Sequence, residues 1–167
     1  ISRELHTADF LIASLGNSLP AAALPAVIFV LAAFTAFSTG SSWGAMGILL
    51  PLVLPLCWAI MSMEGLTAGE DYFILYSSVS GVLAGAVWGD HCSPISDTTV
   101  LSSQASGCHH VEHVRTQLPY ALLVAVISIL CGTIPVGFGL SVWLTLPLGS
   151  LLLIGALAVL GRRVDAS

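Results

Sequence analysis

The sequence predicts an all-α, polytopic membrane helical bundle with about five transmembrane spans, in which some helices are broken. Of the 167 residues, 56% are hydrophobic and only 8% are charged, whereas a soluble domain carries about 25% charged residues. Three long segments, residues 10–63, 72–89 and 116–161, contain no Asp, Glu, Lys or Arg. Because this composition cannot form a water-soluble surface, the lipid bilayer is the expected partner, and nucleic acid is excluded.

The uncharged segments are long enough for five spans, since about 20 apolar residues cross the hydrocarbon core of a bilayer. The polar stretch STGSSWG divides the first segment, and the turn-forming stretch PVGFG divides the last. The predicted spans are residues 20–37, 43–60, 72–89, 116–137 and 140–161.

The ends of the chain and its few arginines suggest its context. It begins at Ile1, without a methionine or a signal pattern, so we interpret residues 1–167 as a single, incomplete membrane domain. Arg115 and the pair Arg162 and Arg163 flank the last two spans on one side. Since arginine and lysine mark the inner side, the C-terminus is expected to be cytoplasmic.

The strongest signal for function is the polar segment WGDHCSPISDTTVLSSQ, residues 88–104, which directly continues the third span. One helix over residues 72–106 would be about 52 Å long, well beyond a hydrocarbon core of about 30 Å. The segment is therefore expected to break. Gly89 is the predicted end of one half-helix, and Ser93 followed by Pro94 is the predicted start of the next.

Such a break can bind a small cation, because helix-end carbonyls and side-chain oxygens replace its water shell. The candidate ligands are two carboxylates and four hydroxyls: Asp90, Asp97, Ser93, Ser96, Thr98 and Thr99. Charged residues inside apolar segments are usually functional. The alternative is that these side chains only cap helices or bond to backbone carbonyls.

A second polar break, FSTGSSWGAMG, covers residues 37–47. Gly40 is expected to end one helix, and Ser41 or Ser42 to cap the next. Two interrupted segments point to a binding site near the middle of the membrane. Four hydroxyls of this break are therefore expected to face Asp90 and Asp97: Ser38, Thr39, Ser41 and Ser42. The alternative is a polar turn between two spans.

These segments resemble a known family. FSTGSSWGAMGILLPL and WGDHCSPISDTTVLSS, followed by GCHHVEHVRTQLPYAL, are similar to signature segments of the NhaC-type sodium/proton antiporter family, over about residues 34–122. The resemblance implies one half of an inverted-repeat transporter in the plasma (inner) membrane of a prokaryote. The N-terminal half of the same transporter is then an expected partner, and a homo-oligomer is left open.

The predicted function is secondary active exchange of sodium ions for protons. Antiport requires one site for which two ions compete, and a desolvated carboxylate can hold either a proton or a sodium ion. Asp90 and Asp97 are the expected shared carriers. The sodium ion and the proton are cargo, with no cofactor, catalytic residue or further metal expected. The resemblance also admits a sodium- or proton-coupled exchanger of organic acids of the malate/lactate type.

Other interpretations of the polar residues stay open. GSSWG fits the G-x-S-x-G motif of serine hydrolases, with Ser42 as nucleophile, but helix-length apolar segments flank it. His91, Cys92 and the stretch CHHVEH gather zinc-type ligands without the spacing of a closed zinc site. His109, His110 and His113 are candidate sensors of cytoplasmic pH, or ordinary loop residues. A structural module without transport activity is a further class.

Overall fold

The computed structural model describes residue 10, residues 12–14 and residues 19–161, and this part of the chain is helical, without strands. Five helical segments are long and apolar enough to cross a membrane, as the sequence predicts: Ala21–Thr39, Ser42–Met63, Gly69–Cys92, His110–Gly137 and Val142–Leu160. The fourth starts six residues before its predicted start. Arg162 and Arg163 lie outside the described residues.

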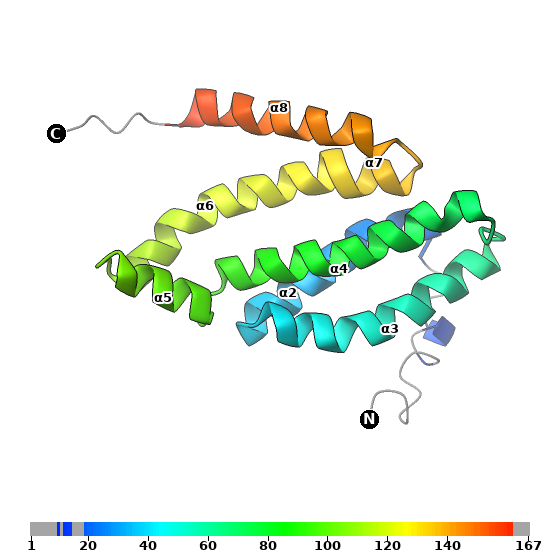
Figure 1. Ribbon diagram of the computed structural model, residues 1–167, viewed down its shortest axis with the longest axis horizontal. Coiled ribbons are helices and arrows are strands. Elements are labelled where there is room, and N and C mark those ends of the chain that lie inside the picture. Colours follow the sequence, from blue (N-terminus) through cyan, green and yellow to red (C-terminus); the bar gives the residue numbers. More distant parts are fainter. Residues whose placement is uncertain (1–9, 11, 15–18, 162–167) are drawn as a thin grey trace.

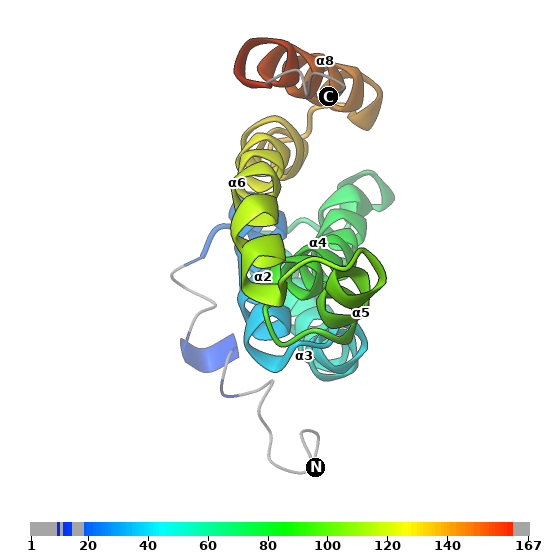
Figure 2. The same ribbon diagram turned by 90° about the vertical axis from the view of Figure 1, so that its left-hand side faces the viewer.

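The bundle consists of a tight group of helices and two outer helices. Figures 1 and 2 show α2, α3 and α4 together, with α6 beside them and α8 at the far edge. The elements in chain order are η1 (Ala21–Ala23), α2 (Leu24–Thr39), α3 (Ser42–Met63), η2 (Gly69–Asp71), α4 (Tyr72–Cys92), α5 (Asp97–Ala105), α6 (His110–Ser128), η3 (Ile129–Thr133), α7 (Ile134–Gly137) and α8 (Val142–Leu160).

The polar break between α2 and α3 is a sharp turn. Gly40 ends α2 with a φ of 68°, a left-handed conformation that glycine adopts without strain. Ser41 caps α3, since its side-chain oxygen accepts a hydrogen bond of 3.2 Å from the backbone N–H of Gly44. The predicted roles of Gly40 and Ser41 are therefore confirmed.

Helices α2 and α4 make the most extensive contact in the bundle. Gly81, Gly85 and Gly89 lie four residues apart on α4, and each faces the backbone of α2. A Cβ atom added at Gly89 would lie 2.1 Å from the carbonyl oxygen of Ala33. Small residues permit this close approach of two helices. Gly89 is thus a packing residue inside α4, and its predicted role as a helix end is wrong.

The break after α4 lies later than predicted. Helix α4 continues to Cys92, and Ser96 rather than Ser93 caps α5, with its side-chain oxygen accepting from the N–H of Thr98 at 3.2 Å. Ser93 instead donates a hydrogen bond of 2.7 Å to the carbonyl oxygen of Phe37 at the end of α2. The unwound stretch is therefore residues 93–96, not residues 90–93.

Helix α6 continues through the π-helical turn η3 into α7. The chain then reverses near Gly139, whose φ is 87°, and enters α8. The predicted turn in PVGFG therefore begins after Gly137. Almost every side chain of α8 is exposed within this chain, and Thr145 is its one buried residue. Its apolar surface is available to lipid, in agreement with an integral membrane protein.

Candidate ion-binding site

Asp90 is the centre of a cluster of polar oxygens formed by both breaks. Its Oδ1 accepts a hydrogen bond of 2.8 Å from the hydroxyl of Ser96, which is fully buried at the start of α5. Its Oδ2 lies 3.4 Å from the hydroxyl of Ser42, in the first turn of α3. The turn between α2 and α3 and the break between α4 and α5 therefore meet at one carboxylate.

The breaks also contact each other through their backbones. A Cβ atom added at Gly40 would lie 3.0 Å from the carbonyl oxygen of Ile95. Together with the bond from Ser93 to Phe37, this contact holds the unwound stretch against the end of α2. The two interrupted segments therefore lie against each other, and of the four hydroxyls expected to face the carboxylates, only that of Ser42 bonds to one among the described residues.

Asp90 lies in the last turn of α4 and not in unwound backbone. It is the 19th of the 21 residues of this helix, counted from Tyr72. The site is therefore in the last turn of α4, whereas the sequence predicts unwound backbone at residues 90–93, near the middle of the membrane. The cause is Gly89, which continues the helix because it packs against α2.

Asp97 is the first residue of α5, and its side chain is exposed. Among the described residues, the hydrogen bonds to Asp90 come from Ser42 and Ser96, and none involves the Asp97 carboxylate. With Ser93 as the predicted start of this helix, Asp97 would lie one turn inside it; that position is wrong because Ser96 is the cap. Its proposed part in ion binding stays a prediction.

The remaining hydroxyls have different surroundings. The hydroxyl oxygen of Thr98 lies 2.7 Å from that of Ser96. Thr98 therefore contacts Asp90 through Ser96 and not directly. Thr99 donates a bond of 3.3 Å to the carbonyl oxygen of His91. Thr39 bonds back to the carbonyl of Thr35 at 2.8 Å. Ser38 is exposed near the end of α2. A role for these groups in ion binding therefore stays a prediction.

No positive side chain balances Asp90 within the part of the chain that the structure describes. Arg115 is the one arginine in this part, and it lies 3.8 Å from Glu112 of its own helix, where both side chains are exposed. A carboxylate surrounded by hydroxyl oxygens is the kind of ligand set that a small hard cation prefers.

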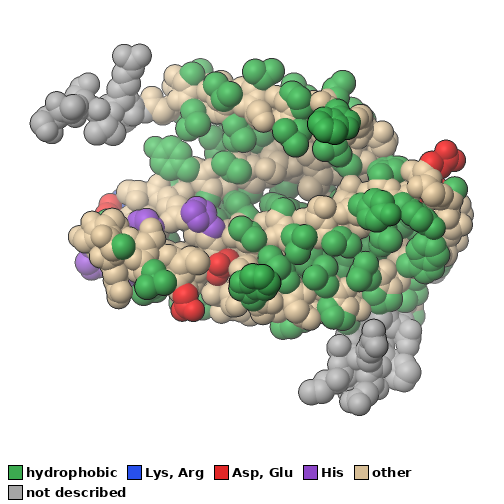
Figure 3. Space-filling view, in the orientation of Figure 1, with side chains coloured by type: hydrophobic (Ala, Val, Ile, Leu, Met, Phe, Trp, Pro, Cys, Tyr) green, Lys and Arg blue, Asp and Glu red, His purple; other side chains and the backbone are tan. Residues whose placement is uncertain are grey.

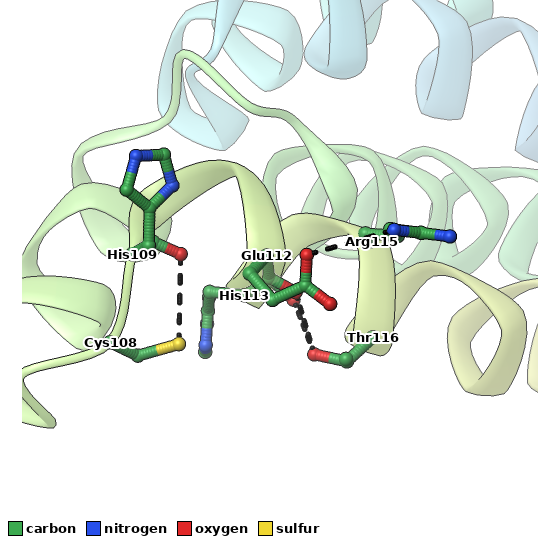
Figure 4. Close-up of polar contacts among 6 residues, drawn as sticks. All are labelled: Cys108, His109, Glu112, His113, Arg115 and Thr116. Carbon is green, nitrogen blue, oxygen red and sulfur yellow. Dashed lines mark hydrogen bonds and ion pairs between the residues drawn. The ribbon is translucent and has the colours of Figure 1, made fainter.

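The three candidate pH-sensing histidines lie in different environments at the start of α6. His110 connects α6 to the break, because its Nε2 is 2.6 Å from the carbonyl oxygen of Pro94 and its Nδ1 is 3.1 Å from Ser103. His109 is exposed, and its carbonyl accepts from the thiol of Cys108 at 3.6 Å. Figure 4 shows that His109 and His113 extend to opposite sides of the chain. A pH-sensing role stays a prediction.

The structure also groups residues that the sequence pattern does not single out. The side-chain nitrogen of Gln117 on α6 donates a hydrogen bond of 2.8 Å to the backbone carbonyl oxygen of His91. The same nitrogen lies 2.6 Å from the imidazole Nε2 of His91. Trp88 donates a bond of 2.8 Å to the carbonyl oxygen of Ala121. These contacts join α6 to α4 beside the Asp90 cluster. A polar amide at the edge of a long uncharged segment is the one sequence signal that marks Gln117.

The structure supports neither the serine-hydrolase interpretation nor the zinc-site interpretation. Within the described ranges, no three His, Cys, Asp or Glu side chains gather closely enough to hold a metal ion, so the zinc interpretation lacks a ligand set. The hydroxyl of Ser42 contacts Asp90, and among the described residues no histidine contacts it, so the serine–histidine pair of a serine hydrolase is not formed in this part of the chain.

Comparison with known proteins identifies relatives. The model of the Na+/H+ antiporter family matches residues 1–137. An uncharacterised protein of Haemophilus influenzae is 45% identical over 135 residues, which are 81% of this chain and 24% of that protein. No solved structure matches this chain.

Two more distant relatives have names that describe transport. A malate-2H+/Na+-lactate antiporter of Bacillus subtilis is 32% identical over 65% of this chain and 21% of its own length. An arginine/ornithine antiporter of Halobacterium salinarum is 35% identical over 63% of this chain and 20% of its own length. The chain thus spans about a fifth to a quarter of the curated relatives that it matches.

Proposed function

This chain belongs to the Na+/H+ antiporter family, and from that premise we propose that the whole protein exchanges sodium ions for protons across a membrane. Its antiporter relatives indicate an exchange transporter rather than an enzyme. The single observation that supports the finer proposal is the Asp90 cluster, where one carboxylate without a countercharge receives hydroxyls from both breaks.

In the proposed mechanism, Asp90 binds a sodium ion and a proton alternately. With sodium bound, the carboxylate and the oxygens of Ser42 and Ser96 provide ligands of the type that a hard cation prefers. Protonation of Asp90 removes its negative charge and releases the ion. Because binding of one ion excludes the other, movement of the loaded site across the membrane produces exchange.

Further parts of the proposal concern the rest of the transporter. Asp97 is proposed as a second carboxylate of the ion site, completed by parts of the protein beyond this chain. The N-terminal half of the same transporter supplies the other wall, and the transported ions are the cargo, without a resident cofactor. We place the protein in the plasma membrane of a prokaryote, with the side of Arg115 towards the cytoplasm.

Exchange of an organic solute is the second candidate function. The names of two relatives, a malate-2H+/Na+-lactate antiporter and an arginine/ornithine antiporter, favour it. In such a protein the Asp90 cluster would hold the coupling ion, and the solute would bind elsewhere.

A transport measurement with the reconstituted full-length protein separates the two functions. A pH gradient is imposed on proteoliposomes, and sodium, potassium, malate and lactate are supplied in separate arms. Our proposal predicts proton flux that depends on sodium alone and that Asp90→Asn lowers by about 100-fold or more, as expected for loss of a proton-transferring group. Flux that requires malate or lactate would instead assign organic-acid exchange.

A further inference from the structure

A polar cavity of about 340 Å3 lies between α4, α5 and α6, beside the Asp90 cluster. Every residue that lines it carries a hydroxyl, an amide or an imidazole: His91, Thr98, Thr99, Ser102, His113, Thr116, Gln117 and Tyr120. Figure 3 shows the histidine side chains of this face at the same end of the molecule, together with acidic ones, while a further acidic group lies at the opposite end. Each residue around this cavity thus offers a polar group, in a bundle whose residues are mainly apolar.

The volume of the cavity and the polar groups around it suit it to water. Water fills cavities that are polar and roomy enough. Since one water occupies about 30 Å3 in the liquid, the cavity has room for a hydrated ion.

The hydroxyls between the cavity and Asp90 form a chain with a defined direction. The one proton of the Ser96 hydroxyl is directed to Asp90 Oδ1, at 2.8 Å. Ser96 Oγ therefore accepts in its 2.7 Å contact with Thr98 Oγ1, and Thr98 is the donor. This series of hydrogen bonds runs from Thr98, which lines the cavity, through Ser96 to the carboxylate of Asp90.

We propose that this cavity is the aqueous entrance through which the exchanged ions reach Asp90, and that Thr98 forms its inner end; the inference rests on the proposed sodium/proton exchange. A hydronium ion in the cavity gives a proton to Thr98 Oγ1, Thr98 passes its own proton to Ser96, and Ser96 passes its own to Asp90 Oδ1. Each hydroxyl keeps one proton, a water molecule stays in the cavity, and the carboxylate becomes a carboxylic acid.

The full-length protein with Thr98→Val tests the entrance, because valine keeps the shape of threonine and lacks its hydroxyl. Thr98→Ser restores the hydroxyl. Ser102→Ala removes a hydroxyl of the same cavity that does not belong to the hydrogen-bonded series from Thr98 to Asp90. Two rates are measured in proteoliposomes: sodium/proton exchange, and exchange of labelled for unlabelled sodium, which needs no proton transfer.

The expected result separates the two modes. Thr98→Val lowers sodium/proton exchange by about tenfold or more, as for a lost proton-transfer group, and lowers sodium/sodium exchange much less. Thr98→Ser and Ser102→Ala resemble the unmodified protein in both modes. Equal loss of both modes in Thr98→Val, or unchanged proton exchange, would overturn the proposed entrance. If the unmodified protein exchanges sodium only for sodium, the proposed function itself fails.

A labelling measurement keeps the proposal testable should the valine variant fail to fold. Ser102→Cys is placed in a protein without other reactive cysteines, and a membrane-impermeant thiol reagent is added on either side of the vesicle. Labelling from the side of Arg115, with block of exchange, is the expected result. A cysteine at this position that reacts from neither side, or that reacts without effect on transport, would contradict an aqueous entrance.

Discussion

At the scale of single residues, the main feature is a carboxylate held by hydroxyls. Asp90 receives a hydrogen bond from Ser96 and contacts Ser42, and no described arginine approaches it. Two neutral donors orient the carboxylate but do not neutralise it. In the proposed exchange, a bound sodium ion or proton supplies the balancing charge.

The proposed role of Asp97 in sodium binding can be tested by substitution. Its exposed carboxylate at the start of α5 is proposed to complete the ion site together with parts of the protein beyond this chain. Asp97→Asn is expected to raise the half-saturating sodium concentration by about tenfold, which corresponds to about 1.4 kcal/mol of binding free energy. The concentration dependence of sodium-driven proton flux measures this effect. An unchanged half-saturating concentration would remove Asp97 from the site.

At the scale of elements, the contact between α2 and α4 positions the site. The glycines of α4 let its backbone approach that of α2, so that the ends of both helices reach the same place. There the Ser93 hydroxyl binds the last turn of α2, and Ser96 binds Asp90. Displacement of α4 along α2 would separate these groups.

Gly85→Ala tests this packing. The added Cβ would lie 2.3 Å from the carbonyl oxygen of Phe29, so the helices must move apart. Overpacking of this kind typically costs about 1–3 kcal/mol. We expect a lower midpoint of thermal unfolding for the purified full-length protein. Gly47→Ala is the matched control, because an added Cβ there meets nothing within 4 Å; equal midpoints for both variants would show that the contact is not tight.

At the scale of the whole molecule, the polar groups gather at one end of an apolar bundle. The Asp90 cluster, the polar cavity, the histidines and Arg115 all belong to the ends of α2 and α4 and the beginnings of α3, α5 and α6. The opposite end carries the connection between α3 and α4, with Glu64, Glu70 and Asp71. The proposed orientation, with the Arg115 side towards the cytoplasm, rests on this asymmetry.

Thiol labelling tests that orientation. Cys108 is exposed in the connection between α5 and α6, and Gly65→Cys places a thiol in the connection between α3 and α4. A membrane-impermeant reagent is expected to label Cys108 in everted vesicles and Gly65→Cys in right-side-out vesicles. The reverse pattern would place the Arg115 side outside the cell.

Much of this fold could be predicted from the sequence, because the bilayer imposes simple limits on length and charge. Uncharged segments of sufficient length give the five spans, and the local preferences of glycine and serine give the turn at Gly40 and Ser41. These features depend on residues close together in the chain.

The details of the site depend on distant partners and could not be predicted. Gly89 resembles a helix end until α2 is placed against it, and Ser93 resembles a cap until its hydroxyl meets Phe37, 56 residues away. Gln117 joins the cavity only because α6 folds back beside α4. Local propensity contains no information about such contacts.

Proton release on sodium binding shows whether the two ions compete at Asp90. Sodium chloride is added to the purified full-length protein in weakly buffered solution at a pH where exchange is active, and the released protons are measured with an indicator dye. The account predicts release from the unmodified protein and from Glu70→Gln, a control that removes an acid at the opposite end of the bundle, and none from Asp90→Asn. Undiminished release from Asp90→Asn would show that sodium and protons do not compete for this carboxylate.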